Sequence, residues 1–149
     1  MILLAHLLLG AAVASKIEYV PLAIILALLS HYFLDLIPHI EYSIKNIKEK
    51  QWHKSAPDIS RVFLDFLFGM LLVLIFSNNQ PLIYICAIVA LIPDSLTIIS
   101  SIFPNKILSA HDKIHTEKIH FLKYKKIPTF WRIFSQVFVI IISIILLKY

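Results

Sequence analysis

Five long apolar segments restrict what this chain can fold into. They are nearly continuous runs of Leu, Ile, Val, Phe and Ala, and they cover residues 2–15, 20–37, 62–76, 81–103 and 133–147. Such runs are too long and too continuous for soluble strands, and in lipid a helix satisfies its own backbone hydrogen bonds. The sequence therefore predicts an all-α, polytopic membrane helix bundle of about five transmembrane or membrane-embedded helices, formed as a single domain.

The composition also favours a membrane protein over a soluble one. Hydrophobic residues make up 59% of the 149 residues and charged residues only 15%. The formal net charge of +5 is compatible with nucleic-acid binding, but the apolar bulk and the placement of the charges favour a membrane surface. We therefore expect the membrane, and no nucleic acid, as a partner.

The first apolar segment, residues 2–15, is short for a membrane span, because about 20 apolar residues are needed to cross the hydrocarbon core. It lacks the basic start of a secretory signal peptide and carries His6 inside the apolar run. We expect it to belong to the mature fold as a tilted, short or re-entrant helix.

The positive charges lie mainly in two polar stretches. Residues 41–61 and 104–132 contain twelve of the 14 Lys and Arg residues, and only Lys16 and Lys148 lie elsewhere. If every apolar segment crosses the membrane, both stretches share one side with the N-terminus. Because cytoplasmic loops are enriched in Lys and Arg, we predict that this is the cytoplasmic side of the inner membrane.

The sequence SHYFLDLIPH places ionisable side chains at the end of the second apolar segment. His31, Asp35 and His39 follow one another at intervals of four, which puts them on one face of a helix. Ionisable groups at membrane depth cost roughly 3 kcal/mol each and are by default functional. Imidazole and carboxylate side chains presented together suit a divalent metal such as zinc or manganese.

Other possible ligands fall in the same membrane leaflet on this topology. They lie near the start of the first segment, early in the third, after Pro93 in the fourth and four apart in the second basic stretch: His6, Asp65, Asp94, His111 and His115. Buried carboxylates without counter-charge would be strongly disfavoured. One or two divalent cations would neutralise them, with zinc as the first expectation and manganese or magnesium as alternatives.

Each of these candidates has a structural alternative. His6 could bond to the backbone of a neighbouring helix, and Asp65 could cap a helix or pair with an arginine one turn earlier. Asp94 could satisfy backbone groups that the proline kink frees. His111 and His115 could be solvated loop residues.

The remaining polar residues are expected to have no role in the site. We predict surface positions for two histidines and ordinary solvated charges at three acidic residues: His53, His120, Asp58, Asp112 and Glu117. The single cysteine, Cys86, excludes an internal disulfide and is expected to pack as a small buried hydrophobic residue.

These motifs resemble those of a known family. The strings AHLLLGAA, LLSHYFLDLIPH and LIPD and a late HxxxH are similar to motifs of the YdjM-like inner-membrane metal-dependent hydrolases. The resemblance implies metal ligands at His6, His31, Asp35, Asp94, His111 and His115, whereas His39 and Asp65 match the pattern less closely. In that family an HRGxTHS motif precedes the SHxxxD motif, whereas here HDKIH follows it.

The HxxxD element is also similar to one in zinc-dependent phospholipase C and related all-helical nucleases, an analogy at the level of the fold. We therefore expect a membrane-embedded metal-dependent hydrolase that cleaves an ester at the cytoplasmic leaflet, most simply a phosphoester of a lipid or lipid-linked substrate. A metal would activate the attacking water. Asp35 or Asp94 would bridge metals or act as general base, and His111 or His115 would complete the ligand set or protonate the leaving group.

The second basic stretch could assist in substrate binding. Tyr124, Phe130 and Trp131 lie near its return to the membrane, where they and the neighbouring lysines would hold anionic headgroups. The same charges could equally serve only to set the topology.

Two other functions stay open. A carrier for divalent metal or protons also needs polar residues along its helices, but the extracytoplasmic halves carry almost none that are ionisable. A non-catalytic scaffold would use a structural metal site, which protein ligands close completely, whereas a catalytic site keeps an open position.

Overall fold

The structure, a computed structural model, describes residues 2–149, apart from the side chains of Lys123 and Tyr124. The expected role of Tyr124 therefore lies outside the described residues. Within them the chain forms eight α-helices and no strand, so the all-α prediction is confirmed. The helices are α1 (Leu3–Ser15), α2 (Val20–Asp35), α3 (Lys45–Lys48), α4 (Ala56–Phe76), α5 (Pro81–Val89), α6 (Ile92–Ile102), α7 (Lys106–Ile114) and α8 (Thr129–Lys148).

Three short helical segments of other types complete the fold. The segments η1 (Trp52–Lys54) and η3 (Phe121–Tyr124) are 3₁₀ helices, and η2 (His115–Ile119) is a π-helix that continues directly from α7.

Proline and asparagine determine several helix boundaries. The helices α2, α4, α5 and α6 each carry a proline in the first or second position, where its missing N–H breaks no helical hydrogen bond. The helix α4 begins at Ala56, six residues before the apolar run, with Pro57 in its second position, so this helix is longer than predicted. Asn105 caps α7 by accepting a hydrogen bond from the backbone N–H of Leu108 at 2.9 Å.

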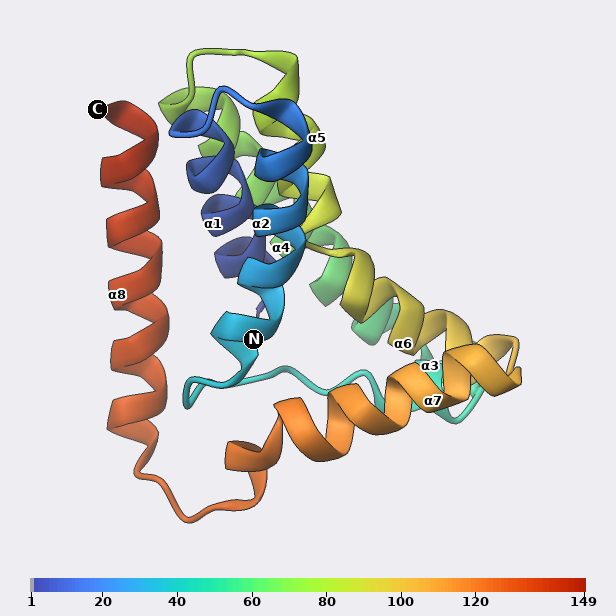
Figure 1. Cartoon of the computed structure of the whole chain (residues 1–149). Helices are drawn as coiled ribbons and strands as arrows, with labels where there is room; N and C mark the ends of the chain where they lie inside the picture. The colour runs from blue at the N-terminus through green and yellow to red at the C-terminus, as the bar shows by residue number, and fades with distance from the viewer. Residues whose placement is uncertain (1) are drawn as a thin grey trace.

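The helix α1 lies in the middle of the bundle and packs against α2, α4, α5 and α8 (Figure 1). Both glycines of the chain are at these contacts. A Cβ atom on Gly10 would lie 2.6 Å from the Cβ of Ala90, and one on Gly69 would lie 2.5 Å from the Cδ1 of Leu7. Small residues thus allow α5 and α4 to approach α1 closely, as is usual between membrane helices.

Two helices of the described chain, α4 and α8, are long and apolar enough to cross a membrane. The pair α5 and α6, bent by 44° at the break between them, would form a third span if it counts as one. The helices α1 and α2, with 13 and 16 residues, are shorter. The outer faces of α4 and α8 expose large apolar side chains, among them Phe68 and Phe138, in the manner of lipid-facing surfaces.

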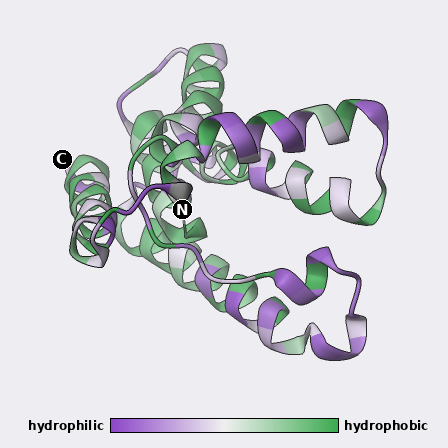
Figure 2. Cartoon of the chain, turned by 90° about the horizontal axis from the view of Figure 1, so that it is seen from below, coloured by the Kyte–Doolittle hydropathy of each residue, from purple (hydrophilic) through white to green (hydrophobic). Residues whose placement is uncertain are grey.

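The two polar stretches meet at one end of the bundle. The turns at residues 16–19 and 77–80 and the C-terminus lie at the opposite end (Figure 1). Seen from the polar end, hydrophilic residues are concentrated in the segments that project from the apolar helices (Figure 2). The fold therefore brings residues 36–55 and 104–128, far apart in the sequence, to the same end.

Candidate metal centre

The carboxylate of Asp35, the last residue of α2, lies inside a cluster of imidazoles. Among the described residues, the Nε2 atoms of five buried histidines lie within 4 Å of its two oxygens. Their distances are 3.0 Å for His31 and His120, 3.3 Å for His6 and His115, and 3.9 Å for His39. One histidine lies in α1, one in α2, one in the segment after α2, one in η2 and one directly after η2: His6, His31, His39, His115 and His120.

Three of these side chains, His31, Asp35 and His115, form a group with Asp94 of α6 that could hold a metal ion. The Nε2 of His31 lies 3.0 Å from Asp35 Oδ2, 3.1 Å from His115 Nε2 and 3.7 Å from Asp94 Oδ1. The Nε2 of His115 lies 3.3 Å from Asp35 Oδ2 and 4.0 Å from Asp94 Oδ1. Four ligand atoms around a tetrahedral zinc ion are about 3.4 Å apart, so these distances fit one ion.

The tautomer of His31 supports this interpretation. Its Nδ1 lies 2.7 Å from the carbonyl oxygen of Ala90, which can only accept, so Nδ1 carries the proton. In the neutral ring the lone pair of Nε2 then faces the Asp35 oxygen at 3.0 Å. Two acceptors at this distance repel each other unless a proton or a cation lies between them. A carbonyl that orients an imidazole in this way is the usual second partner of a metal-bound histidine.

A second group contains Asp35 again, together with His39 and His120. The prediction that His39 shares a helical face with His31 is wrong, because α2 ends at Asp35, three residues before Pro38. The chain after the helix nevertheless returns the His39 ring to Asp35. The prediction of a surface position for His120 is also wrong, since this residue is buried.

The π-helical segment explains why the spacing of residues in the sequence does not indicate that His120 lies in the site. His115 and His120 are five residues apart, which places them on different faces of an α-helix. In the π-helix η2 the hydrogen bonds connect residues five apart, and the N–H of His120 donates to the carbonyl of His115 at 3.1 Å. Both rings therefore reach Asp35, with their centroids 4.7 Å apart. No 3.6-residue periodicity could have indicated this.

Three of the predicted ligands lie outside both groups: His6, whose Nε2 lies 3.3 Å from Asp35 Oδ1, Asp65 and His111. Asp65 accepts hydrogen bonds at its Oδ2 from the backbone N–H groups of Leu3, at 2.6 Å, and Leu4, at 3.4 Å. It therefore caps α1, as the helix-cap alternative proposed. The Nε2 of His111 lies 3.2 Å from the hydroxyl of Tyr32, and its ring stacks on that of His115 with the centroids 5.5 Å apart.

The other acidic residues and the remaining histidine have simpler positions. Asp58 is buried, accepts a hydrogen bond from the backbone N–H of Asn46 at 2.9 Å and lies 3.8 Å from Arg61, so the prediction of a solvated charge is wrong. His53 and Glu117 are exposed, as expected. Asp112, which is partly buried, accepts a hydrogen bond from the hydroxyl of Thr116. Cys86 is buried and free, as expected.

The local charges act differently on two of the histidines outside the membrane-spanning helices, His120 and His111. Burial alone would lower the pKa of His120, but the carboxylates of Asp35 and Glu41 beside its ring outweigh burial and raise it to about 9. Burial, together with the charge of the neighbouring His115, lowers the pKa of His111. In the absence of a metal His120 therefore carries a proton at neutral pH, and a metal must displace it.

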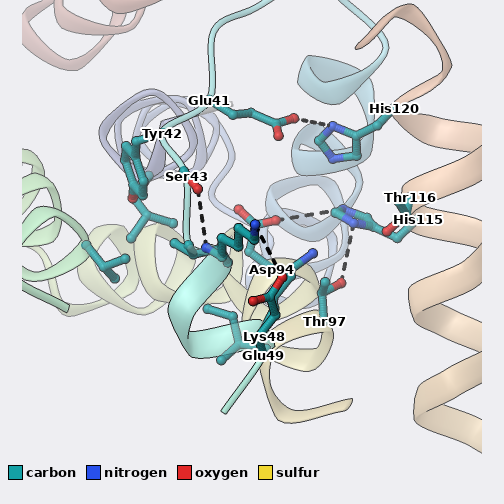
Figure 3. Close-up of a pocket in the computed structure, with 15 residues that line it drawn as sticks. Glu41, Tyr42, Ser43, Lys48, Glu49, Asp94, Thr97, His115, Thr116 and His120 are labelled. Atoms are coloured by element: carbon teal, nitrogen blue, oxygen red, sulfur yellow. Dashed lines mark hydrogen bonds and ion pairs between the residues drawn. The ribbon is translucent and has the colours of Figure 1, made fainter. Parts of the chain in front are cut away.

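A cavity of about 380 Å³ adjoins the two groups (Figure 3). It lies between residues 41–49, α6 and the α7–η2 helix. Asp94, His115 and His120 form its inner wall, and Lys45 and Lys48 of α3 line it from the other side. Three side chains of the two candidate groups thus face an open space, whereas His31, Asp35 and His39 do not line it.

Comparisons with protein-family models, with curated proteins and with solved structures found no match to this chain. The resemblance to the YdjM-like family therefore rests on the short motifs quoted above.

Proposed function

We propose that this protein is an integral membrane, metal-dependent hydrolase related to the YdjM-like proteins. Its substrate would be an ester, most simply a phosphoester of a lipid or lipid-linked molecule. One observation carries the proposal: the buried group of His31, Asp35, Asp94 and His115, spaced like the ligands of a single ion, borders a cavity.

The cavity favours catalysis over a purely structural metal. A structural site is closed by protein ligands, whereas a catalytic site leaves one position open to water or substrate. The side chains of His31 and Asp35 are fully buried, but that of Asp94 is 24% exposed and lines the cavity. The ion would therefore be reachable from the Asp94 side.

The chemistry can be divided between the ion and the side chains. A bound divalent ion would lower the pKa of a water and polarise the ester. Asp94, the most exposed carboxylate of the group, is placed to orient that water and accept its proton. His31 and His115 would hold the ion, with their Nδ1 atoms beside the Ala90 carbonyl and the Thr97 hydroxyl.

The lining of the cavity suits a substrate with an anionic head and an apolar part. Lys48 and Lys45, the latter 3.7 Å from Glu49, supply positive charge close to the ligand wall, which also contains Glu41. The apolar side chains of Ile44, Val62 and Ile98 also line the space. A phosphoester would place its charge between the lysines and the ion, and its hydrocarbon part against the apolar wall.

The location of the site supports a lipid substrate at the cytoplasmic leaflet. The cavity lies at the polar end of the bundle, which carries twelve of the 14 Lys and Arg residues. By the positive-inside rule this end, with the N-terminus, faces the cytoplasm. All five apolar segments would then lie in or at the membrane, with the shorter α1 inside the bundle and the shorter α2 packed against it.

Metal analysis of the detergent-purified protein tests the proposal. Wild type should carry stoichiometric metal and hydrolyse bis-p-nitrophenyl phosphate, while His31→Ala and Asp94→Ala should lose both properties. The exposed His53→Ala is the matched control and should behave as wild type. Wild type without metal, or metal unaffected by both changes, would refute the site.

The same material separates the rival functions. Stoichiometric metal without hydrolysis of this or any lipid phosphoester would favour a structural site. Metal uptake into proteoliposomes that depends on Asp94 would favour a carrier.

A further inference from the structure

We infer that a second metal ion binds beside the first, held by Asp35, His39 and His120, so that Asp35 bridges a dinuclear centre. The two candidate groups share this carboxylate. The first group approaches its Oδ2 through His31 and His115. In the second group His120 also approaches Oδ2, and His39 approaches Oδ1. A carboxylate shared by two sets of imidazoles is the arrangement that a pair of ions requires.

The geometry of His39 repeats that of His31. Its Nδ1 lies 2.6 Å from the carbonyl oxygen of Ile37, so Nδ1 donates and the lone pair of the neutral ring is on Nε2. That Nε2 lies 3.0 Å from Glu41 Oε1 and 3.9 Å from Asp35 Oδ1. An acceptor surrounded by carboxylate oxygens is stabilised by a cation between them.

His120 is oriented for the same ion. Its Nδ1 lies 2.7 Å from Glu41 Oε1, and its Nε2 lies 3.0 Å from Asp35 Oδ2. A carboxylate on one ring nitrogen and an ion on the other is the common pattern for metal-bound histidine. Glu41 is therefore a positioning residue for His120, and it stands at ligand-to-ligand distance from His39.

His6 supplies an independent observation on the same side of Asp35. The ring is fully buried, and neither of its nitrogens has a hydrogen-bond partner within the described chain. Its Nε2 lies 3.3 Å from Asp35 Oδ1, the oxygen that also faces His39. The Nε2 of His6 thus faces a carboxylate oxygen without a well-formed hydrogen bond, and an ion near Oδ1 would give this nitrogen a favourable partner.

Two divalent ions also balance the charge of the pocket. Asp35, Asp94 and Glu41 bring three carboxylates close together, and the histidines must be neutral to bind metal, so divalent ions would add positive charge where the carboxylates meet. Paired ions about 3.5–4 Å apart are a frequent device for phosphoester hydrolysis. The role of paired ions in hydrolysis rests on the proposed function, whereas the binding of a second ion does not.

Metal titration of the stripped protein tests the inference. Wild type loaded with Mn²⁺ should bind two ions per chain, and its electron paramagnetic resonance spectrum should show exchange coupling between them. His39→Ala and His120→Ala should each bind one ion and lose the coupling, while the exposed His53→Ala should retain two coupled ions.

The outcomes are decisive without relying on the variants. One ion per chain in wild type, or two ions without coupling, would overturn the bridged pair even if a variant failed to fold. Two coupled ions without hydrolysis would keep the dinuclear centre and refute the proposed reaction instead. Retention of two coupled ions in both variants would show that other residues bind the second ion.

Discussion

The Nε2 atom of His31 lies 3.1 Å from the Nε2 atom of His115, although the two residues are 84 positions apart in the chain. His31 reaches this point from the last turn of α2, and His115 from the junction between α7 and η2. Because the Ala90 carbonyl accepts the Nδ1 proton of His31, its Nε2 is left to bind. Metal binding should therefore depend on contacts between distant segments.

Asp35→Asn is expected to remove metal more completely than any single histidine change. The substitution keeps the size of the side chain but removes the charge that both groups share. We expect metal content below one tenth of wild type by mass spectrometry after dialysis. Retention of one tightly bound ion would contradict the shared role of Asp35, provided that circular dichroism shows an unchanged helix content.

Glu41→Gln should weaken the second ion selectively. The amide keeps an acceptor but loses the charge that polarises the His120 ring, and such changes around metal ligands typically cost about 10–100-fold in affinity. Competition with a fluorescent zinc chelator should show one weakened and one unchanged site. Equal weakening of both ions would argue that Glu41 acts through the fold.

Metal affinity should rise with pH between about 7 and 9. The pKa of His120 is about 9 without metal, so below this value an ion must displace a proton from the ring. One displaced proton corresponds to about a tenfold gain in affinity per pH unit. In His120→Ala this part of the pH dependence should disappear, and an unchanged slope would show that another group titrates.

Gly10→Ala should destabilise the bundle and disturb the first ion together. The new methyl group would lie 2.6 Å from Ala90 Cβ and 2.7 Å from the Cys86 carbonyl oxygen, so α5 must move. Overpacking of this kind costs about 1–3 kcal/mol, and here it displaces the residue whose carbonyl orients His31. Thermal unfolding in detergent and metal content measure the two effects.

Gly69→Ala is the matched control for that change. Its methyl group would meet the end of the flexible Leu7 side chain first, at the contact between α4 and α1. We expect some loss of stability but normal metal content. Loss of metal in this variant would mean that any disturbance of α1 affects the site.

Asp65→Ala should lower stability and leave metal content unchanged. The Asp65 carboxylate accepts the N–H groups of Leu3 and Leu4 at the start of α1, and loss of a helix cap costs about 1 kcal/mol. Unfolding temperature and metal content separate a cap from a ligand. Loss of metal without loss of stability would restore Asp65 as a ligand.

Much of the fold could be predicted from local patterns. The apolar segments correspond to α1, α2, α4, the α5–α6 pair and α8, because long apolar runs in lipid leave the helix as the only way to pair the backbone. The close placement of His31 and Asp35 also follows from their spacing within one helix. Within a single uninterrupted helix, the spacing in the chain therefore predicted correctly which side chains lie together.

The sequence by itself determined the helical class, the polar end of the bundle and the pairing of His31 with Asp35. Only the tertiary structure decided which other side chains join them. Because α2 ends at Asp35, His39 lies in the segment after the helix. The π-helical turn places His120, a residue expected at the surface, in the buried cluster. The physical reason is that a metal site requires distances of a few ångströms between segments far apart in the chain. Helix ends and helix packing determine those distances, and they cannot be derived from the spacing of residues along the sequence.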